Sequence, residues 1–571
     1  MRTPEPGGQL MTSTVETNAD VPYISRRSAV YGTHYMVAST QPLASQAGVR
    51  ILEQGGSAAD AAVAVAAALG VTEPFSTGVG GDCFCLFYRA SDKTVHGLNG
   101  SGRVPEALTV ERLRTEFGID GDAIPAHSVH AVTVPGAVAG WIDAIERFGS
   151  GRIALADILQ PAVELAAEGF PVAELTVPFW REGAELLRTT AIPDGEELLV
   201  DGKGPEVGQI FRNPTLAHTL RLVAKHGKRG FYEGTVADAI VDSVRRCGGV
   251  LAHSDLRRHR SSCEEPVSIA YQGHRLYECA PNGGGLAALL ALGIVRELER
   301  QQTVADMGHN SAAHLHLVIE ALRLAFADAR LHVCDPEFGD VPVDRLLNCE
   351  HLKSRAEAFD PERAAADVEA GAPLGGSDTV YFAVVDAEGN ACSFVNSLYH
   401  SFGSGIVPHG CGFALHDRGC LFQLDPRHAN CLAPRKRPFH TIIPAMVTTD
   451  SDLGLDLEIV FGIMGGFNQP QAQLQALLNM VRFGMSPQAA LDAPRISIQL
   501  EDGRIAVEEG IAEETVAQLR RLGHNVYVVS GLQRSVFGRG QIIRLHADSR
   551  TGGRVLVGGS DPRSDGQAMG R

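Results

Sequence analysis

Residues 375–386 read Gly-Gly-Ser-Asp-Thr-Val-Tyr-Phe-Ala-Val-Val-Asp, and this stretch decides how the chain folds. It passes from a glycine-rich segment into β-branched and aromatic residues, which predicts a buried strand that begins at Thr379. Residues 387–390 then supply a turn, and residues 391–398 form a second apolar run. The sequence therefore predicts a β-hairpin whose first strand starts with a hydroxyl-bearing residue.

The segments around this hairpin predict a layered α+β body. Residues 360–378 are rich in Ala, Glu, Pro and Gly, which is typical of a flexible surface linker. Ser57 is expected to cap an alanine-rich helix over 58–69 that Gly70 ends. Residues 131–260 are expected to be mainly helical. Further strands are expected at 443–448, 457–463, 505–508, 525–529 and 540–546, with helices at 470–483 and 512–522.

Composition excludes several classes of protein. The 571 residues carry 50 Lys+Arg against 67 Asp+Glu, a net charge of −17 that disfavours nucleic acid and anionic membranes as partners. The most apolar stretch, 58–71, is shorter than the ~20 residues that span a bilayer. Residues 1–20 hold no apolar signal segment, and residues 1–25 are expected to be a disordered tail. Eleven scattered cysteines without a C-x-x-C pair indicate free thiols, so we expect a cytoplasmic protein.

Thr379 is the first candidate for chemistry. Its hydroxyl could attack the carbonyl of Asp378 and form an ester that water hydrolyses, leaving Thr379 at a new N-terminus. An α-amine with an unperturbed pKa of ~7.7 could then act as the base for its own hydroxyl. The simpler alternative is a threonine that only starts a strand.

Two further groups of residues are candidate sites. Gly465 and Gly466 lie between an apolar strand and a helix, where successive N–H groups could bind an oxyanion; an ordinary turn is the alternative. A second set has ligand types that suit zinc, but its spacing fits no standard pattern, and no metal is expected. That set is Cys411, His416, Cys420, His428 and Cys431.

Together these motifs resemble the γ-glutamyltranspeptidase family of N-terminal-nucleophile hydrolases, over roughly residues 30–560. The resemblance depends on many ordered matches, any one of which would be weak alone. The matching segments are 55–63, 70–74, 78–81, 132–136, 322–328, Thr379 with 384–390, 402–405, 436–438 and 465–466.

The resemblance implies a four-layer αββα sandwich and a proenzyme that cuts itself between Asp378 and Thr379. A helix-rich large chain, 26–378 after its tail, would stay associated with a small chain, 379–571. By the family's motif, Thr379 is the nucleophile, Ser397 supports it by hydrogen bonding, and the amides of Gly465 and Gly466 form the oxyanion hole. No cofactor is implied.

The sequence departs from the family where γ-glutamyl substrates are bound. Serine stands in place of the arginine of an Arg-x-x-Ala-Pro motif, and Leu421 stands in place of an aspartate. Unpaired buried charges are costly, so such changes should alter selectivity strongly. The positions expected to line the substrate site are Ser101, Arg103, Tyr399, His440 and Thr441.

The leading interpretation is an autoprocessed threonine amidohydrolase that acts through an acyl-enzyme. Its nominal activity is hydrolysis of glutathione or other γ-glutamyl amides, with weaker transfer to an amine. The first alternative is an acylase or amidase for a non-glutamyl acyl group, such as a dicarboxylic monoamide. The second alternative is an unprocessed, catalytically silent paralogue that acts as a scaffold.

Overall fold

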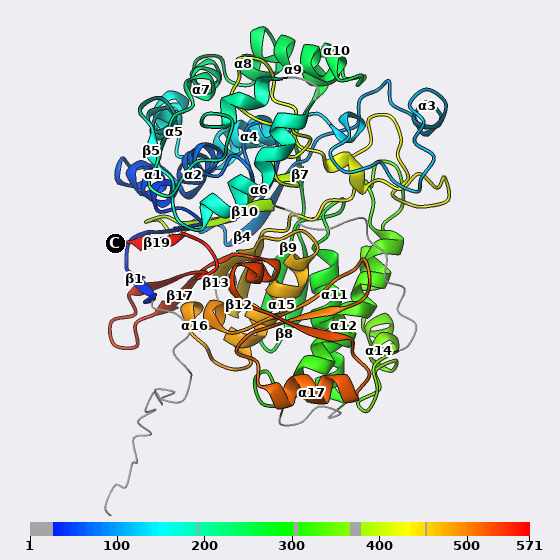
Figure 1. The fold of residues 1–571 in the computed structure, drawn as a ribbon. Coiled ribbons are helices and arrows are strands. Elements are labelled where there is room, and N and C mark those ends of the chain that lie inside the picture. Colours follow the sequence, from blue (N-terminus) through cyan, green and yellow to red (C-terminus); the bar gives the residue numbers. More distant parts are fainter. Residues whose placement is uncertain (1–26, 191–192, 302–306, 366–377, 452–453) are drawn as a thin grey trace, which may run out of the picture.

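The fold is the four-layer αββα sandwich that the resemblance implied (Figure 1). The computed structural model describes residues 27–190, 193–301, 307–365, 378–451 and 454–571. The expected tail at 1–25 and most of the expected linker at 360–378 lie outside these residues. Within the described ranges, no helix combines the length and the apolar character needed to cross a membrane.

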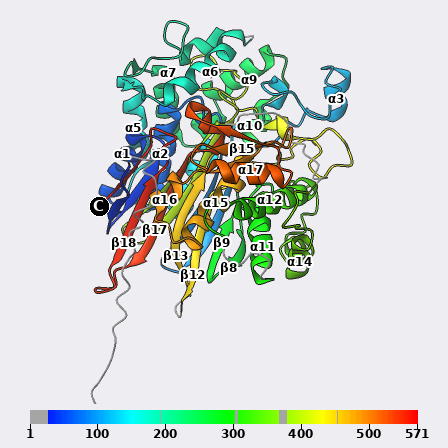
Figure 2. The same cartoon turned by 60° about the horizontal axis from the view of Figure 1, so that its bottom comes forward.

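Two seven-stranded sheets form the middle layers. In Figure 2 the strands of the second sheet lie side by side from β18 to β8. The first sheet has the order β19 (Gln567–Gly570), β2 (Met36–Ser39), β10 (Asp378–Val385), β11 (Ala391–Tyr399), β3 (Asp82–Arg89), β4 (Thr94–Gly100), β7 (Ser262–Glu264). The second has the order β1 (Val30–Gly32), β18 (Arg554–Ser560), β17 (Gly540–Ala547), β13 (Gly454–Ile463), β12 (Ala445–Ser451), β9 (His274–Glu278), β8 (Val267–Tyr271).

Strand β10 is buried on both faces, as the apolar run predicted. Val380 and Phe382 pack into the core shared with the helices, whereas Tyr381 and Ala383 pack into the core between the sheets. This alternation follows from the two-residue period of a strand. The second sheet approaches Tyr381 closely at Gly462, where an added Cβ would lie 2.4 Å from the ring.

The helices above the first sheet in Figure 1 surround the alanine-rich helix α2 (Ala58–Thr72), whose residues are all buried. Ser57 and Asp60 form a capping box at its start, as expected from the sequence. The expectation that Gly70 ends this helix is wrong, because the helix continues to Thr72. A Cβ at Gly70 would lie 3.1 Å from the Cα of Gly78, so the glycine permits a close backbone contact.

The remaining helices complete the two outer layers. Above the first sheet lie α1 (Pro42–Glu53), α4 (Ala137–Phe148), α5 (Leu155–Glu168), α6 (Thr176–Thr189), α7 (Pro214–His226) and α9 (Thr235–Arg246). Against the second sheet lie α11 (Leu286–Arg300), α12 (Ala312–His332), α14 (Cys349–Ala356), α15 (Asn468–Val481), α16 (Pro487–Asp492) and α17 (Glu513–Arg521).

Shorter elements connect these layers. They are α3 (Val110–Thr115), α8 (Arg229–Tyr232), α10 (His253–Arg258), α13 (Val343–Leu346), η1 (Val129–Ala131), η2 (Pro193–Leu198), η3 (Arg418–Leu421) and η4 (Gly531–Phe537). Two small sheets pair β5 (Phe170–Pro171) with β6 (Ile210–Phe211), and join β14 (Ile496–Ile498), β15 (Ile505–Glu508) and β16 (Val526–Val529).

Each large sheet draws strands from both sides of the Asp378–Thr379 bond. In the first sheet, β10 lies between β2 and β11, and β11 pairs with β3 on its other side. In the second sheet, β12 pairs with β9, and β18 pairs with β1. The segments before and after this bond therefore share both sheets, and helices of both segments cover the second sheet, whereas the helices named above the first sheet all precede the bond.

Candidate active site

The first strand of the predicted hairpin brings Thr379 opposite Ser397. The two residues are register partners on β10 and β11, and both are fully buried. Their hydroxyl oxygens lie 2.9 Å apart, which is hydrogen-bonding distance. The ladder shifts its register between Asp378 and Thr379, so the regular pairing begins at the threonine. Gly81 makes room for this arrangement, because a Cβ there would lie 2.3 Å from the carbonyl oxygen of Ser397.

The contacts of Ser397 fix the direction in which its hydroxyl points. Its oxygen accepts hydrogen bonds from the Tyr399 amide at 2.9 Å and from Nη2 of Arg418 at 2.8 Å. A hydroxyl has two acceptor lone pairs and one proton, so both lone pairs are occupied. The proton is left for the carbonyl oxygen of Asp378, 3.2 Å away, or for the hydroxyl of Thr379. Ser397 is thus a donor toward the Asp378–Thr379 linkage.

Arg418 is a buried cation beside these hydroxyls. Its guanidinium also donates to Oγ1 of Thr441 at 2.9 Å and stacks 4.4 Å from the ring centroid of Tyr399. Burial lowers the pKa of Arg418, although Asp82 opposes this. No carboxylate of the described residues lies within ion-pair distance of it. The φ angle of Tyr399 is +78°, a left-handed backbone conformation that is uncommon for a non-glycine residue.

A buried carboxylate balances the charge of Arg418. Asp82, the first residue of β3, accepts from Nε2 of His440 at 3.0 Å and from the Gly102 amide at 3.0 Å. Burial opposes ionisation of Asp82, but His416, His440 and Arg418 together hold the pKa of its carboxyl well below the usual value. Burial and Arg418 lower the pKa of His440 to about 3. His440 is therefore neutral near pH 7 and acts as a hydrogen-bond donor to Asp82.

The two glycines after β13 present unpaired amides. Gly465 and Gly466 have φ angles of +129° and +54°, and their carbonyls accept from the amides of Asn468 and Gln469. Neither glycine N–H has an acceptor among the described residues. Two adjacent, unpaired backbone donors form the arrangement that binds an oxyanion.

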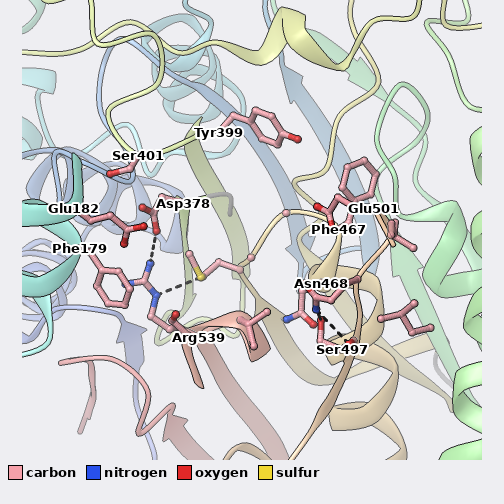
Figure 3. A pocket seen from close by; sticks show the side chains of 18 residues that line it. Phe179, Glu182, Asp378, Tyr399, Ser401, Phe467, Asn468, Ser497, Glu501 and Arg539 are labelled. Atoms are coloured by element: carbon pink, nitrogen blue, oxygen red, sulfur yellow. Dashed lines mark hydrogen bonds and ion pairs between the residues drawn. The ribbon is translucent and has the colours of Figure 1, made fainter. Parts of the chain in front are cut away.

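Part of this site lines one cavity of about 250 Å³ (Figure 3), whereas Thr379 and Ser397 are fully buried and are not among its lining residues. Asp378, Tyr399, Gly465 and Gly466 are among the residues that line it. Arg539 extends into the same space toward Asp378. The residue that precedes Thr379 and the two glycines with unpaired amides therefore border the same cavity.

The structure brings some of the expected substrate residues to this site and leaves others away from it. Tyr399 lines the cavity, whereas Thr441 contacts Arg418, His440 contacts Asp82, and neither of these two lines it. Ser101 is buried and donates to Oδ1 of Asn99 at 2.8 Å. Arg103 pairs with the exposed Glu337 at 2.7 Å. Neither Ser101 nor Arg103 is among the residues that line the cavity.

The five cysteine and histidine residues with ligand types that suit zinc do not form a metal site among the described residues. All eleven cysteines are free thiols. The described residues hold three groups whose ligand atoms lie close enough for a metal ion, and none contains two members of that set. Those groups are His127 with His400 and Asp417, His316 with Glu320 and His524, and Asp194 with Glu197 and His409.

Three residues of the site were missed in the sequence. Asp82 directly follows the 78–81 glycine motif, so its place at the start of a strand was a usable signal. Arg418 begins the short helix η3, and no local pattern in the sequence marks it as buried. Arg539 stands between Gly538 and Gly540 at the start of β17, where a long cation flanked by glycines could have drawn attention.

Comparison with known proteins shows that the chain has relatives of similar sequence over most of its length. The family model described as Gamma-glutamyltranspeptidase matches residues 44–571. The chain is 38% identical over 548 residues to the Glutathione hydrolase-like YwrD proenzyme of Bacillus subtilis, covering 95% of this chain and 99% of that protein. It is 34% identical over 550 residues to the Oxamate amidohydrolase proenzyme of Klebsiella pneumoniae, covering 95% and 99%.

A solved structure is similar to this chain over nearly its whole length. The crystal structure of cephalosporin acylase from Bacillus halodurans superposes with a TM-score of 0.86 at 39% sequence identity. That match covers 97% of this chain and 98% of the other. The likeness therefore includes both large sheets and both helical layers.

Proposed function

Because the chain belongs to the gamma-glutamyltranspeptidase family, we propose that it cuts itself before Thr379 and then uses this residue as its nucleophile. It is an amidohydrolase of the N-terminal-nucleophile type. The observation that carries the proposal is the contact of Thr379 with Ser397 at the head of β10, beside a cavity lined by two unpaired glycine amides.

Self-cleavage is proposed to begin with the hydroxyl of Thr379. Its Oγ1 attacks the carbonyl carbon of Asp378, and Ser397 donates to the carbonyl oxygen as negative charge develops there. The C–N bond breaks, the departing nitrogen takes up a proton, and an aspartyl ester on Thr379 remains. Water hydrolyses the ester and releases the carboxylate of Asp378. The products are a large chain ending at residue 378 and a small chain, 379–571.

The mature site is proposed to repeat this chemistry on a small-molecule amide. The free α-amine of Thr379 takes the proton of Oγ1, which attacks the substrate carbonyl. The Gly465 and Gly466 amides donate to the oxyanion, and Ser397 donates to Oγ1 and keeps its position. The substrate amine leaves with a proton, and water or a second amine then takes the acyl group from Thr379.

Two acyl donors fit this mechanism. Hydrolysis of γ-glutamyl amides is supported by the family and by a relative named as glutathione hydrolase-like. Hydrolysis of a dicarboxylic monoamide or a related acyl group is supported equally, by relatives named for oxamate amidohydrolase and cephalosporin acylase.

The decisive experiment on self-cleavage is incubation of purified precursor, with N-terminal sequencing of the smaller fragment. We expect a sequence that begins Thr-Val-Tyr-Phe, and a Thr379→Ala variant that stays as one chain. A smaller fragment that begins elsewhere, or cleavage of the alanine variant, would reject the mechanism. A protein that never splits would support the silent scaffold.

The acyl donor is tested on the processed protein. γ-Glutamyl-p-nitroanilide is compared with p-nitroanilides of dicarboxylic acids, and release of p-nitroaniline is followed. Turnover of the dicarboxylic amides without turnover of the γ-glutamyl amide would assign an acylase. Turnover of the γ-glutamyl amide alone would assign a glutathione-type hydrolase.

A further inference from the structure

Asp378 is held by a buried arginine inside the candidate active site. Nη2 of Arg539 lies 3.1 Å from Oδ1 of Asp378, and the arginine side chain is only 4% exposed. Its Nε donates to Sδ of Met464 at 3.3 Å, and its guanidinium lies 4.7 Å from the ring centroid of Phe179 (Figure 3). Three contacts thus fix the arginine, and one of them is with the side chain of the residue before Thr379.

The acyl group of Asp378 is itself the first acyl group that Thr379 receives. In the ester of self-cleavage, the carbonyl carbon of Asp378 is bonded to Oγ1 of Thr379. A substrate acyl group is bonded to the same oxygen in the mature enzyme, so its carbonyl carbon also lies one bond from Oγ1 of Thr379. The side-chain carboxylate of Asp378, two carbons from this carbonyl carbon, marks where the substituent of an acyl group can lie.

Cleavage would make Asp378 a chain end, and its departure would leave Arg539 without its anion. Among the described residues, Asp378 is the one carboxylate within ion-pair distance of Arg539. Glu182 is exposed at the edge of the cavity, and Glu73 is a buried carboxyl whose pKa is raised by burial and lowered by Arg539. A buried guanidinium without a directly bonded anion is unfavourable, so the mature site is prepared to bind one.

We propose that Arg539 binds a carboxylate of the acyl donor in the place that the Asp378 side chain occupies in the precursor. The donor is then a monoamide of a dicarboxylic acid, with two carbons between the acyl carbon and the carboxylate carbon, as in a succinyl group. This inference rests on the proposed function, since it assumes that Thr379 receives both acyl groups. Arg539 can bind the carboxylate with two N–H groups, which favours a planar anion over a neutral group.

The test compares p-nitroanilides that differ only in the acyl chain. Succinyl- and butyryl-p-nitroanilide have the same number of carbons and exchange a carboxylate for a methyl group, while oxalyl- and glutaryl-p-nitroanilide vary the distance. We expect kcat/KM of the processed protein for the succinyl amide to exceed that for the butyryl amide by at least about tenfold. Within the acids, we expect the succinyl amide to be best and the oxalyl amide to be worst.

The variant that removes the cation is Arg539→Gln in an Asp378→Asn background, where the two neutral side chains can still pair in the precursor. Processing is first checked on a denaturing gel. We expect the succinyl-to-butyryl ratio of kcat/KM to fall to near one in this variant. Arg539→Lys keeps the charge and the native Asp378 contact, so it should process and retain part of the preference.

The matched control is Arg544→Gln, on the same strand, whose arginine pairs with Glu458 at 2.7 Å and is partly exposed. Its succinyl-to-butyryl ratio should equal that of the parent. A succinyl-to-butyryl ratio near one in the parent, or an unchanged ratio in the processed Arg539→Gln protein, would overturn the proposed role of Arg539. Either result would leave the proposed amidohydrolase function standing. A processed parent that hydrolyses only γ-glutamyl-p-nitroanilide would also overturn the role of Arg539 alone, whereas one that hydrolyses neither that amide nor any of these acyl amides would reject the proposed function as well.

Discussion

At the scale of single residues, the hydrogen bonds that Ser397 accepts determine the direction in which its hydroxyl proton points. Arg418 and the Tyr399 amide occupy both lone pairs of its oxygen, so its proton must point toward the Asp378–Thr379 linkage. Without Arg418 the hydroxyl could rotate and accept from Thr379. Arg418 is therefore a positioning residue for self-cleavage and for the proposed nucleophile.

Replacement of Arg418 by Met tests this positioning. The variant loses a charge-assisted hydrogen bond of about 1.5–3 kcal/mol, so we expect self-cleavage to slow about 10- to 100-fold. The rate is measured as loss of the full-length band. Arg418→Lys should recover part of the rate if donation to Ser397 is what matters. Cleavage of the Met variant at the parental rate would show that Ser397 keeps its direction without Arg418.

The free amine of Thr379 gives the second prediction at this scale. It must be unprotonated to accept the proton of Oγ1, so kcat/KM should rise with pH through a single ionisation. An unperturbed α-amino group has a pKa of about 7.7, and we expect the midpoint near this value. The profile is measured with a p-nitroanilide on processed protein. Activity that falls as pH rises across this range would contradict the amine as the base.

At the scale of elements, the turn of the β10–β11 hairpin caps helix α2. One carboxylate oxygen of Asp386 accepts from the Ala58 amide, the first of the helix, at 2.9 Å. The other accepts from the Asn390 amide within the turn at 2.9 Å. Asp386 thus joins the start of a fully buried helix to the hairpin that bears Thr379.

Removal of this carboxylate should destabilise both elements together. We expect Asp386→Ala to lower the free energy of unfolding by about 1–2 kcal/mol, as loss of a helix cap usually does. Urea unfolding with circular dichroism measures this change. Glu388→Ala, an exposed position in the same turn, is the control and should stay close to the parent. Equal stability of the two variants would show that the Asp386 contacts contribute little.

The sequence predicted those helices and strands in which apolar residues recur at a clear spacing. The hairpin at 379–398, the helix behind Ser57 and the helices at 154–168 and 214–226 are confirmed within a few residues. The predicted end of α2 at Gly70 is wrong, because this glycine permits a close backbone contact with Gly78 and the helix continues to Thr72. The last two strands, β18 and β19, were missed because polar and glycine residues interrupt their apolar pattern.

The site was predicted only as far as its residues lie in sequence motifs. Thr379, Ser397 and the glycine pair belong to recognisable motifs, and the structure brings Thr379 and Ser397 into contact. Arg418, Asp82 and Arg539 contribute through contacts between distant segments. Local sequence does not specify such contacts, since they depend on how the two sheets and their loops pack.

At the scale of the whole molecule, four buried histidines link stability to acidity. Burial is the first cause that lowers the pKa of each to about 3. An unfolded histidine has a pKa of about 6.5, so between these values the unfolded chain binds more protons than the folded one. Stability is then complete above about pH 6.5 and decreases as pH falls below it. The four are His259, His314, His440 and His524.

The expected result is a steep loss of stability under mild acid. Each such histidine contributes up to about 1.4 kcal/mol per pH unit below its unfolded pKa. Urea midpoints measured between about pH 7 and about pH 5 should therefore fall together with thermal midpoints. His314→Gln should flatten this slope, since His314 is buried and its two ring nitrogens have no hydrogen-bond partner among the described residues. A pH-independent midpoint across this range would refute the linkage.

The shared sheets also predict how the two proposed chains behave after cleavage. Both should elute as one particle in native size-exclusion chromatography, and separate bands should appear only after denaturation. The reason is that β10 pairs with β2, and β11 with β3, across the division between the chains. Separate elution of the fragments in native buffer would contradict this expectation.

The position of β10 inside the first sheet has a consequence for the life of the protein in a cell. A strand with neighbours on both sides cannot be exchanged for a fresh copy without opening the sheet, so a damaged small chain cannot be replaced by newly made material. Each molecule would be made, activated and degraded as one unit, and the cellular supply of active sites would equal the number of precursors that fold correctly.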